Sequence, residues 1–170
     1  KEVKSDLNTI YYRDTPIFSD PRNKKLGARI FSNLEKLYLT IKKLNLKIVD
    51  VSEYYSLAHK LGVPEKGLIN LKDQLFGLEA NFEKFQAIDF KKGCFIGQEN
   101  TARMKLKNKL RRRLLPMSSN EKLTIGDEVT YNDNKIGKIL IDNPYPFGLI
   151  KIIDPDLEEF KNKKLLANNK

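Results

Sequence analysis

Apolar residues follow helical spacing most clearly between residues 50 and 61. One face of a 3.6-residue helix there collects Val51, Tyr54, Leu57, Ala58 and Leu61. Asp50 can cap the first turn, Glu53 stands three residues later as in a capping box, and Gly62 is a stop signal. The pattern predicts a helix over residues 50–61. His59 falls off the apolar face, so we expect it to be exposed and to have no catalytic role.

Two β-rich runs lie nearer the start of the chain. Residues 7–13 and 26–32 flank an Asp-Pro turn at residues 20–21, a pattern typical of a hairpin. We expect these two strands to pair with each other. Residues 37–46 combine apolar side chains with Lys pairs, and their pattern is compatible with either a strand or a helix.

Past residue 108 the pattern changes to short β-rich runs. They occupy residues 109–117, 127–131, 135–141 and 147–153. Such spacing favours a small antiparallel barrel or sandwich. Short helices are expected before it, near residues 71–76, 82–86 and 98–105. From Glu158 onward the chain is rich in Lys and Asn, and we expect it to fray.

Composition narrows the candidate functions. The 170 residues carry a net charge of +10 but only one Cys and one His, which excludes an intrachain disulfide and a structural zinc or iron–sulfur site held by this chain alone. Phosphate-loop, dinucleotide-binding and Gly-x-Ser-x-Gly patterns are absent from the sequence. No apolar run approaches the ~18 residues of a membrane span, and no signal peptide is expected. Without an initiator Met, we expect a processed chain or a piece of a longer one.

The positive charge is concentrated in one segment. Residues 91–113 hold nine basic side chains and one acid, so they account for +8 of the net charge. This concentration indicates an anionic partner, although a solvated strand face would have the same composition.

Gly93 and Gly97 bracket Cys94 in this segment. Glycines allow a positive φ or a close approach of the backbone to a ligand. A thiol beside two Lys, shortly before a helix, is in a setting that lowers its pKa. The alternative is a tight turn with a small, unreactive side chain at position 94.

The run Lys-Gly-Cys-Phe-Ile-Gly-Gln-Glu at residues 92–99 closely resembles the signature of the YgfZ family. These folate-binding relatives of the glycine-cleavage T-protein (aminomethyltransferase) serve iron–sulfur cluster assembly or repair. Four more motifs resemble the family in the same order: Asp20-Pro21-Arg22, Gly62-Val63-Pro64-Glu65, Leu78-Glu79-Ala80-Asn81-Phe82 and Arg111-Arg112-Arg113-Leu114-Leu115.

The resemblance implies an α+β fold with two parts. Residues 1–107 would be the later part of a T-protein-like folate-binding core, and residues 108–170 a small C-terminal antiparallel β-barrel. The family's N-terminal portion has no counterpart here, so the missing N-terminal region of the same protein is an expected partner. The expected location is the cytoplasm for a bacterial protein and the mitochondrial matrix for a eukaryotic one.

The resemblance also assigns cofactor-binding residues for tetrahydrofolate or a derivative. Glu79 matches the family's pterin-binding Glu, and a carboxylate can accept bonds from the pterin amine and ring N–H together. The alternative is an ordinary loop acid. Lys92 and Arg103 are candidates for the anionic folate tail, and Gly93 and Gly97 shape the signature loop.

The resemblance makes Cys94 the candidate catalytic residue, as a reactive thiol. It could ligate an iron–sulfur cluster transiently shared with a partner, exchange redox equivalents or protect an exposed cluster. The chain alone is not expected to hold a metal. Arg22 and Arg29 are weaker candidates, which could instead fix their hairpin to the core. We expect Glu99 to brace the turn.

Three functions remain open. The first is a tetrahydrofolate-binding accessory protein for iron–sulfur client proteins, linked to tRNA modification only through such clients. The second is an aminomethyltransferase, although a T-protein normally has no Cys at this position. The third is a nucleic-acid-binding module, which sparse aromatic residues near residues 103–113 disfavour. The sequence does not decide whether the protein is an enzyme; no membrane partner is expected.

Overall fold

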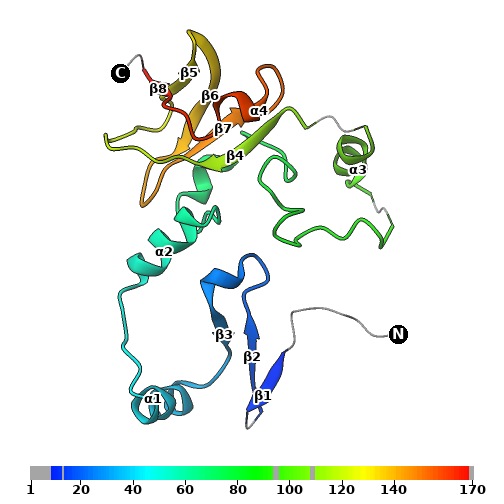
Figure 1. Cartoon of the computed structure of the whole chain (residues 1–170). Coiled ribbons are helices and arrows are strands. Elements are labelled where there is room, and N and C mark those ends of the chain that lie inside the picture. Colours follow the sequence, from blue (N-terminus) through cyan, green and yellow to red (C-terminus); the bar gives the residue numbers. More distant parts are fainter. Residues whose placement is uncertain (1–8, 13, 94–95, 108–109, 169–170) are drawn as a thin grey trace.

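The computed structural model describes residues 9–12, 14–93, 96–107 and 110–168. Two antiparallel sheets are connected by helices and long loops (Figure 1). In chain order the elements are β1 (Ile10–Tyr12), β2 (Thr15–Ser19), η1 (Lys24–Leu26), β3 (Ala28–Ile30), α1 (Leu34–Lys43), α2 (Val51–Lys60), η2 (Leu68–Leu71), α3 (Glu99–Leu106), β4 (Arg112–Pro116), β5 (Glu128–Tyr131), β6 (Asn134–Ile141), β7 (Phe147–Lys151), α4 (Leu157–Phe160) and β8 (Leu166–Ala167).

The N-terminal sheet has the order β1-β2-β3, so the predicted direct pairing of residues 7–13 with 26–32 is wrong. β2 lies between the two and pairs with both. Asp14 has a φ of 63°, which permits the tight turn from β1 into β2. Pro16 explains why the pattern did not indicate a strand there, since a proline argues against a central strand.

Helices α1 and α2 each begin at a residue whose polar side chain caps the first turn. Residues 37–46, which the pattern left ambiguous, fall mainly in helix α1, and the Asn33 side chain caps it by accepting from the Lys36 amide at 2.8 Å. Helix α2 agrees closely with its prediction. Its Asp50 side chain accepts from the Ser52 amide, 2.8 Å away, rather than from that of Glu53 as a capping box requires.

The C-terminal sheet has the order β4-β7-β6-β5-β8. β5 and β6 meet at Asn132 and Asp133, whose positive φ values of 48° and 60° suit a two-residue hairpin turn. β4 and β8 are the two ends of the described sheet, so its strands form an open antiparallel sheet rather than a closed barrel (Figure 1).

Apolar side chains cover both faces of this sheet. Leu140 and Leu149 belong to one buried cluster, against which Leu71 and Leu75 pack. The neighbouring residues in each strand belong to a second cluster; it contains Val129, Ile136, Ile139, Ile150 and Phe160. Because side chains alternate along a strand, the two clusters lie on opposite faces.

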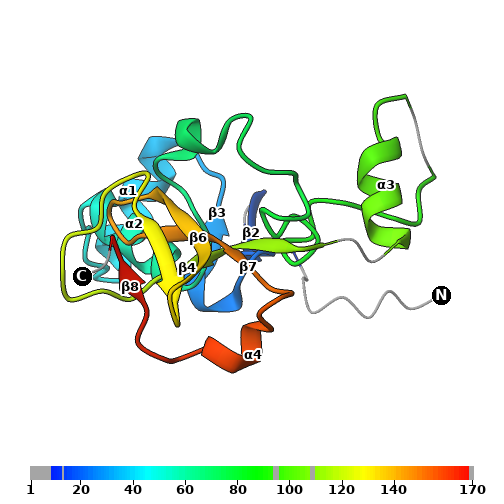
Figure 2. The same ribbon diagram turned by 90° about the horizontal axis from the view of Figure 1, so that it is seen from above.

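The end of the described chain is ordered against the second cluster, and the prediction of fraying from Glu158 is wrong for this part. Phe160 of helix α4 is 2% exposed. Asp156 and Glu159 form a capping box at the start of the helix. Residues 166–167 then pair with β5 (Figure 2).

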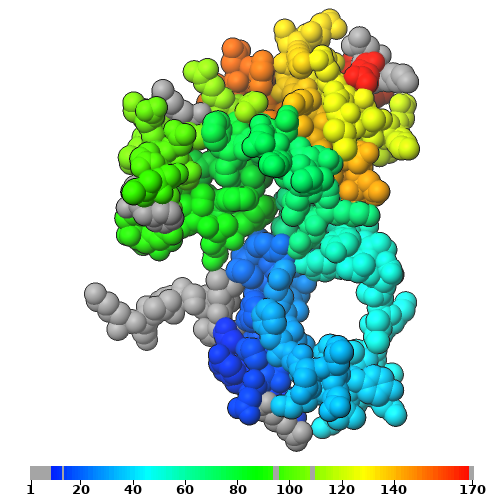
Figure 3. Space-filling view, turned by 180° about the vertical axis from the view of Figure 1, so that it is seen from behind, coloured from blue at the N-terminus to red at the C-terminus, as the bar shows by residue number. Residues whose placement is uncertain are grey.

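The region from β1 to the start of α2 buries much less apolar surface. Helix α1 has no buried residue, although it contains several apolar side chains. Leu34 is 83% exposed and Ile48 is 73% exposed. Figure 3 shows an opening framed by the N-terminal sheet, α1 and the chain that leads to α2.

Candidate functional site

Strand β4 contacts the loop that precedes α3 through two hydrogen bonds to the backbone of Leu114. The carbonyl oxygen of Glu79 accepts from the Leu114 amide at 2.9 Å, and the Asn81 side-chain amide donates to the Leu114 carbonyl at 2.7 Å. Glu79 and Asn81 are 4% and 6% exposed. Residues 79–81 therefore cover the edge of β4 that does not face β7.

The Glu79 carboxylate lies inside this contact. Its Oε1 is 2.9 Å from Nε of Arg112, and its Oε2 is 3.2 Å from a terminal nitrogen of the same guanidinium. Oε2 also accepts from the Phe76 amide at 2.9 Å. Oε1 has one hydrogen bond among the described residues, so it retains acceptor capacity for one further donor. A ligand amine would share this oxygen with Arg112.

The signature segment is described on both sides of its centre. The predicted reactive Cys94 lies outside the described residues, as does Phe95. Gly93 and Gly97 have φ values of 84° and 95°, and a Cβ on either would meet no heavy atom within 4 Å. These glycines therefore serve the backbone conformation rather than a close approach to another part of the described chain.

Glu99 braces the turn after the signature, because its Oε2 accepts from the Gly97 amide at 3.0 Å. Helix α3 follows and stands apart from both sheets (Figure 2). Lys92 and Arg103, the candidates for an anionic tail, are exposed on either side of the turn. Lys105 links α3 to the loop before it through an ion pair with Glu83.

A second polar cluster joins the N-terminal sheet, at the connection between β2 and β3, to helix α2. Asp20 is 1% exposed, and its carboxylate accepts from Arg22 at 2.8 Å and from Arg29 at 2.8 Å. Both guanidiniums also contact the Tyr54 hydroxyl, and Arg22 pairs with Glu65. Hydrogen bonds from Arg22 and then Arg29 hold the pKa of Asp20 well below its usual range, despite its burial. The two arginines thus fix their hairpin to the core.

His59 is fully buried, so the prediction of an exposed His is wrong. Its Nδ1 lies 3.0 Å from the Tyr145 carbonyl, and its Nε2 accepts from the amides of Glu65 and Lys66 at 3.1 Å. These partners require a neutral ring with its proton on Nδ1. Burial lowers the pKa of His59, and its ring packs edge-on against Phe147. The residue connects α2 to the C-terminal sheet.

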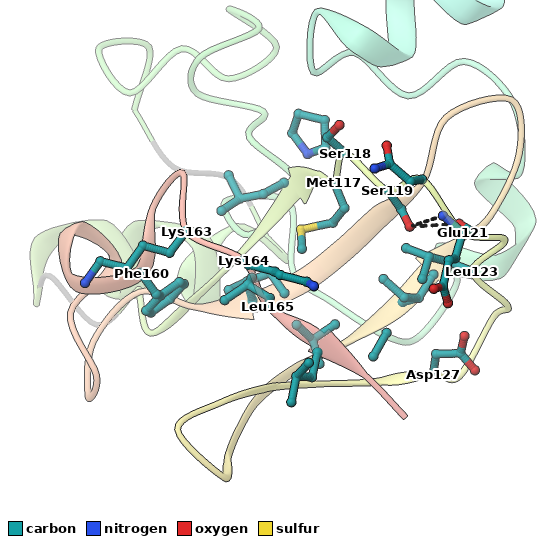
Figure 4. A pocket seen from close by; sticks show the side chains of 18 of the residues that line it. Met117, Ser118, Ser119, Glu121, Leu123, Asp127, Phe160, Lys163, Lys164 and Leu165 are labelled. Carbon is teal, nitrogen blue, oxygen red and sulfur yellow. Dashed lines mark hydrogen bonds between the residues drawn. The ribbon is translucent and has the colours of Figure 1, made fainter. Parts of the chain in front are cut away.

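A pocket of about 1120 Å³ lies over the second apolar cluster (Figure 4). Its walls come from residues 115–124, Leu157 and residues 160–168, and Val129, Ile139 and Ile150 form part of its floor. Of the predicted site residues that the structure describes, none lines it. The pocket and the signature segment are therefore separate features of the described chain.

Two further classes of site have no support among the described residues. They contain no group of three or more His, Cys, Asp or Glu placed to hold a metal ion. Within the same residues, no helix combines the length and apolar character needed to cross a bilayer.

No family model matches the chain. It is similar to curated proteins named mitochondrial iron–sulfur cluster assembly factor IBA57 or its homologue. The Neurospora crassa protein is 28% identical over 141 residues, which cover 82% of this chain and 29% of that protein. The Mus musculus protein is 31% identical over 104 residues, or 61% of this chain and 28% of its own length. The Homo sapiens protein is 32% identical over 102 residues, with 59% and 28% covered. The chain's relatives are thus iron–sulfur cluster assembly factors, and it spans less than a third of their length.

Proposed function

We propose that this chain is part of a tetrahydrofolate-binding accessory factor of the YgfZ type, which assists the assembly or repair of iron–sulfur proteins. The similarity to iron–sulfur cluster assembly factors, extending over 82% of the chain in one relative, is the observation that carries this proposal. The five ordered motifs add support for the folate-binding family.

Glu79 is the residue proposed to hold the pterin. Its carboxylate is 5% exposed and is oriented by its ion pair with Arg112. The remaining acceptor capacity of Oε1 fits one amine or ring N–H donor, and a two-donor contact requires Arg112 to move. Folate would supply a one-carbon carrier at this site. Lys92 and Arg103 are proposed to attract its anionic tail.

Cys94 is proposed as the thiol that meets the iron–sulfur substrate. One thiolate leaves the other coordination positions of a cluster unfilled, so ligands from a client protein are required. The neighbouring cation Lys92 favours the thiolate form needed for ligation or exchange.

Other parts of the protein are proposed to complete the folate pocket. The chain spans only 29% of the Neurospora crassa relative, and apolar residues of α1 and of residues 44–51 are exposed. An exposed apolar surface of this extent is typical of an interaction site. Because the relatives are named mitochondrial, we propose the mitochondrial matrix for a eukaryotic protein.

The test uses full-length protein and cells that lack it. Tetrahydrofolate should bind wild type saturably, and Glu79→Gln should weaken binding at least about tenfold, the loss of one charge-assisted contact. Glu121→Gln, a change in an exposed acid elsewhere, is the matched control. Cys94→Ser should fail to restore the activity of an iron–sulfur enzyme while retaining folate binding.

Two results would overturn the proposal. Full rescue by Cys94→Ser would remove the thiol from the mechanism. Robust transfer of a methylene group from an aminomethyl-lipoyl carrier protein to tetrahydrofolate, with release of ammonia, would instead identify an aminomethyltransferase.

A further inference from the structure

A small pocket of about 120 Å³ lies where helix α3, the segment around residues 78–84 and the start of β4 meet. This volume corresponds to roughly four water molecules, at about 30 Å³ each. This space is sufficient for one carboxylate or phosphate group. Its polar lining residues are Asn81, Glu83, Lys84, Lys105 and Arg113.

The lining carries an excess of positive charge. Three of its side chains are cationic, whereas Glu83 is its one acid. Glu83 already forms an ion pair with Lys105. Lys84 and Arg113 therefore face the pocket region without an acidic partner among the described residues. This distinguishes them from Arg112, the neighbouring cation in β4, which Glu79 neutralises.

Arg113 is oriented by a buried amide. The Asn81 Oδ1 accepts from a terminal nitrogen of Arg113 at 3.2 Å, and the other end of the same amide is fixed by the Leu114 carbonyl at 2.7 Å. Asn81 is 6% exposed. The guanidinium is thus held at one N–H while its other donors stay available, an arrangement suited to an oxyanion.

The pKa of Lys84 is lowered at this position. Burial is the main cause that lowers its pKa, and the charges of Arg113 and Lys161 lower it further. An anion placed between these cations would offset their repulsion.

We propose that Lys84 and Arg113 form a binding site for a terminal oxyanion, the carboxylate or phosphate end of a ligand. The site does not use Glu79 or Cys94, so it is independent of the function proposed above. The concentration of positive charge in residues 91–113 raises the local concentration of anions near it.

The experiment titrates full-length protein with inorganic phosphate and, separately, with glutarate at constant ionic strength. Binding is followed by the ¹⁵N shift of the Arg113 side-chain Nε–H and by calorimetry. Wild type should bind one of the two anions saturably at millimolar concentration, and the stronger arm identifies phosphate or carboxylate as the preferred group. Lys84→Gln and Arg113→Gln should each weaken binding about tenfold or more, whereas Arg113→Lys should retain part of it.

Lys43→Gln is the matched control, because it removes an exposed cation at the end of helix α1. It should leave anion affinity unchanged within about twofold. Thermal unfolding of each variant separates lost binding from lost folding. The proposal is wrong if neither anion binds saturably, or if the two Gln variants bind like wild type. It is also wrong if single-stranded RNA displaces phosphate with a steep salt dependence that Arg103→Gln reduces as much as Arg113→Gln.

Discussion

The guanidinium of Arg112 donates two hydrogen bonds to the carboxylate of Glu79, with Nε 2.9 Å from Oε1 and a terminal nitrogen 3.2 Å from Oε2. The pair joins a loop of the predicted folate-binding core to the first strand of the predicted C-terminal domain. Asn81 and Arg113 repeat the connection two residues further along the loop. The sequence boundary near residue 107 is therefore crossed by specific contacts.

The first prediction concerns this pair. Glu79→Gln should lower the free energy of unfolding by about 1–2 kcal/mol, because it removes a charged acceptor that is buried while Arg112 stays partly solvated. Glu83→Gln, which breaks the exposed pair with Lys105, should cost less than about 1 kcal/mol. Urea unfolding of both variants measures the difference, and equal losses would contradict the role given to burial.

The second prediction concerns Asp20. Asp20→Asn leaves Arg22 and Arg29 facing each other without their shared carboxylate, and should cost about 2–4 kcal/mol. The same carboxylate gives a pH dependence. Its pKa is lower in the folded state, so its contribution is complete above the unfolded pKa near 3.8 and is lost as the pH falls below it.

Unfolding free energies of wild type and Asp20→Asn at pH 7 and pH 3 provide the check. The difference between the two proteins should shrink at the lower pH. A difference that stayed constant would show that the charge of Asp20 is not what stabilises the network.

The third prediction uses the single His of the chain. Burial lowers the folded-state pKa of His59, so the unfolded state takes up a proton first as the pH falls below about 6.5. Above that pH, the titration of His59 should not change the free energy of unfolding. As the pH falls from 6.5 towards the lower folded-state pKa, the free energy of unfolding should decrease. His59→Gln should lack this step, although it should be less stable overall because Gln does not reproduce the ring contacts.

Chemical denaturation at closely spaced pH values from 8 to 5 follows the His59 step. A greater free energy of unfolding at pH 5.5 than at pH 7, with the step absent in His59→Gln, would contradict the predicted decrease.

The fourth prediction concerns the C-terminal helix. Phe160→Ala should destabilise the protein by about 3–5 kcal/mol, because the ring is 2% exposed and fills the second apolar cluster. Leu166→Ala is the comparison, since Leu166 is 41% exposed and should cost below about 1 kcal/mol. Thermal unfolding separates the two, and a small loss for Phe160→Ala would restore the expectation of a frayed end.

Local patterns predicted the elements whose stability is local. The stripe around Leu57 with its Asp50 cap located helix α2, and the β-rich runs located β4 to β7. Contacts between distant segments were not readable in the same way. His59 was placed in solvent because periodicity ignores a carbonyl 86 residues away, that of Tyr145. Strand β2 was missed for a different reason, because Pro16 is a local signal against a central strand.

In the candidate site, too, the sequence identified individual residues but not the contacts between distant segments. The motifs identified Glu79 as important, and a neighbouring cation is a natural partner for a buried acid. Which of the three consecutive arginines at 111–113 faces it depends on the alternation and register of β4, and these are set by pairing with β7. A sequence signal for Asn81 was present in its motif, but its contact with Arg113 required the strand to be placed.

The covering of β4 by residues 79–81 also bears on solubility. An unpaired strand presents backbone donors and acceptors that can recruit another molecule into a growing fibre. The loop occupies these groups on one side of the sheet, and on the other side the terminal strand is only two residues long. Among the described residues, neither border of the sheet offers a long template for intermolecular strand addition, which should limit association through this sheet.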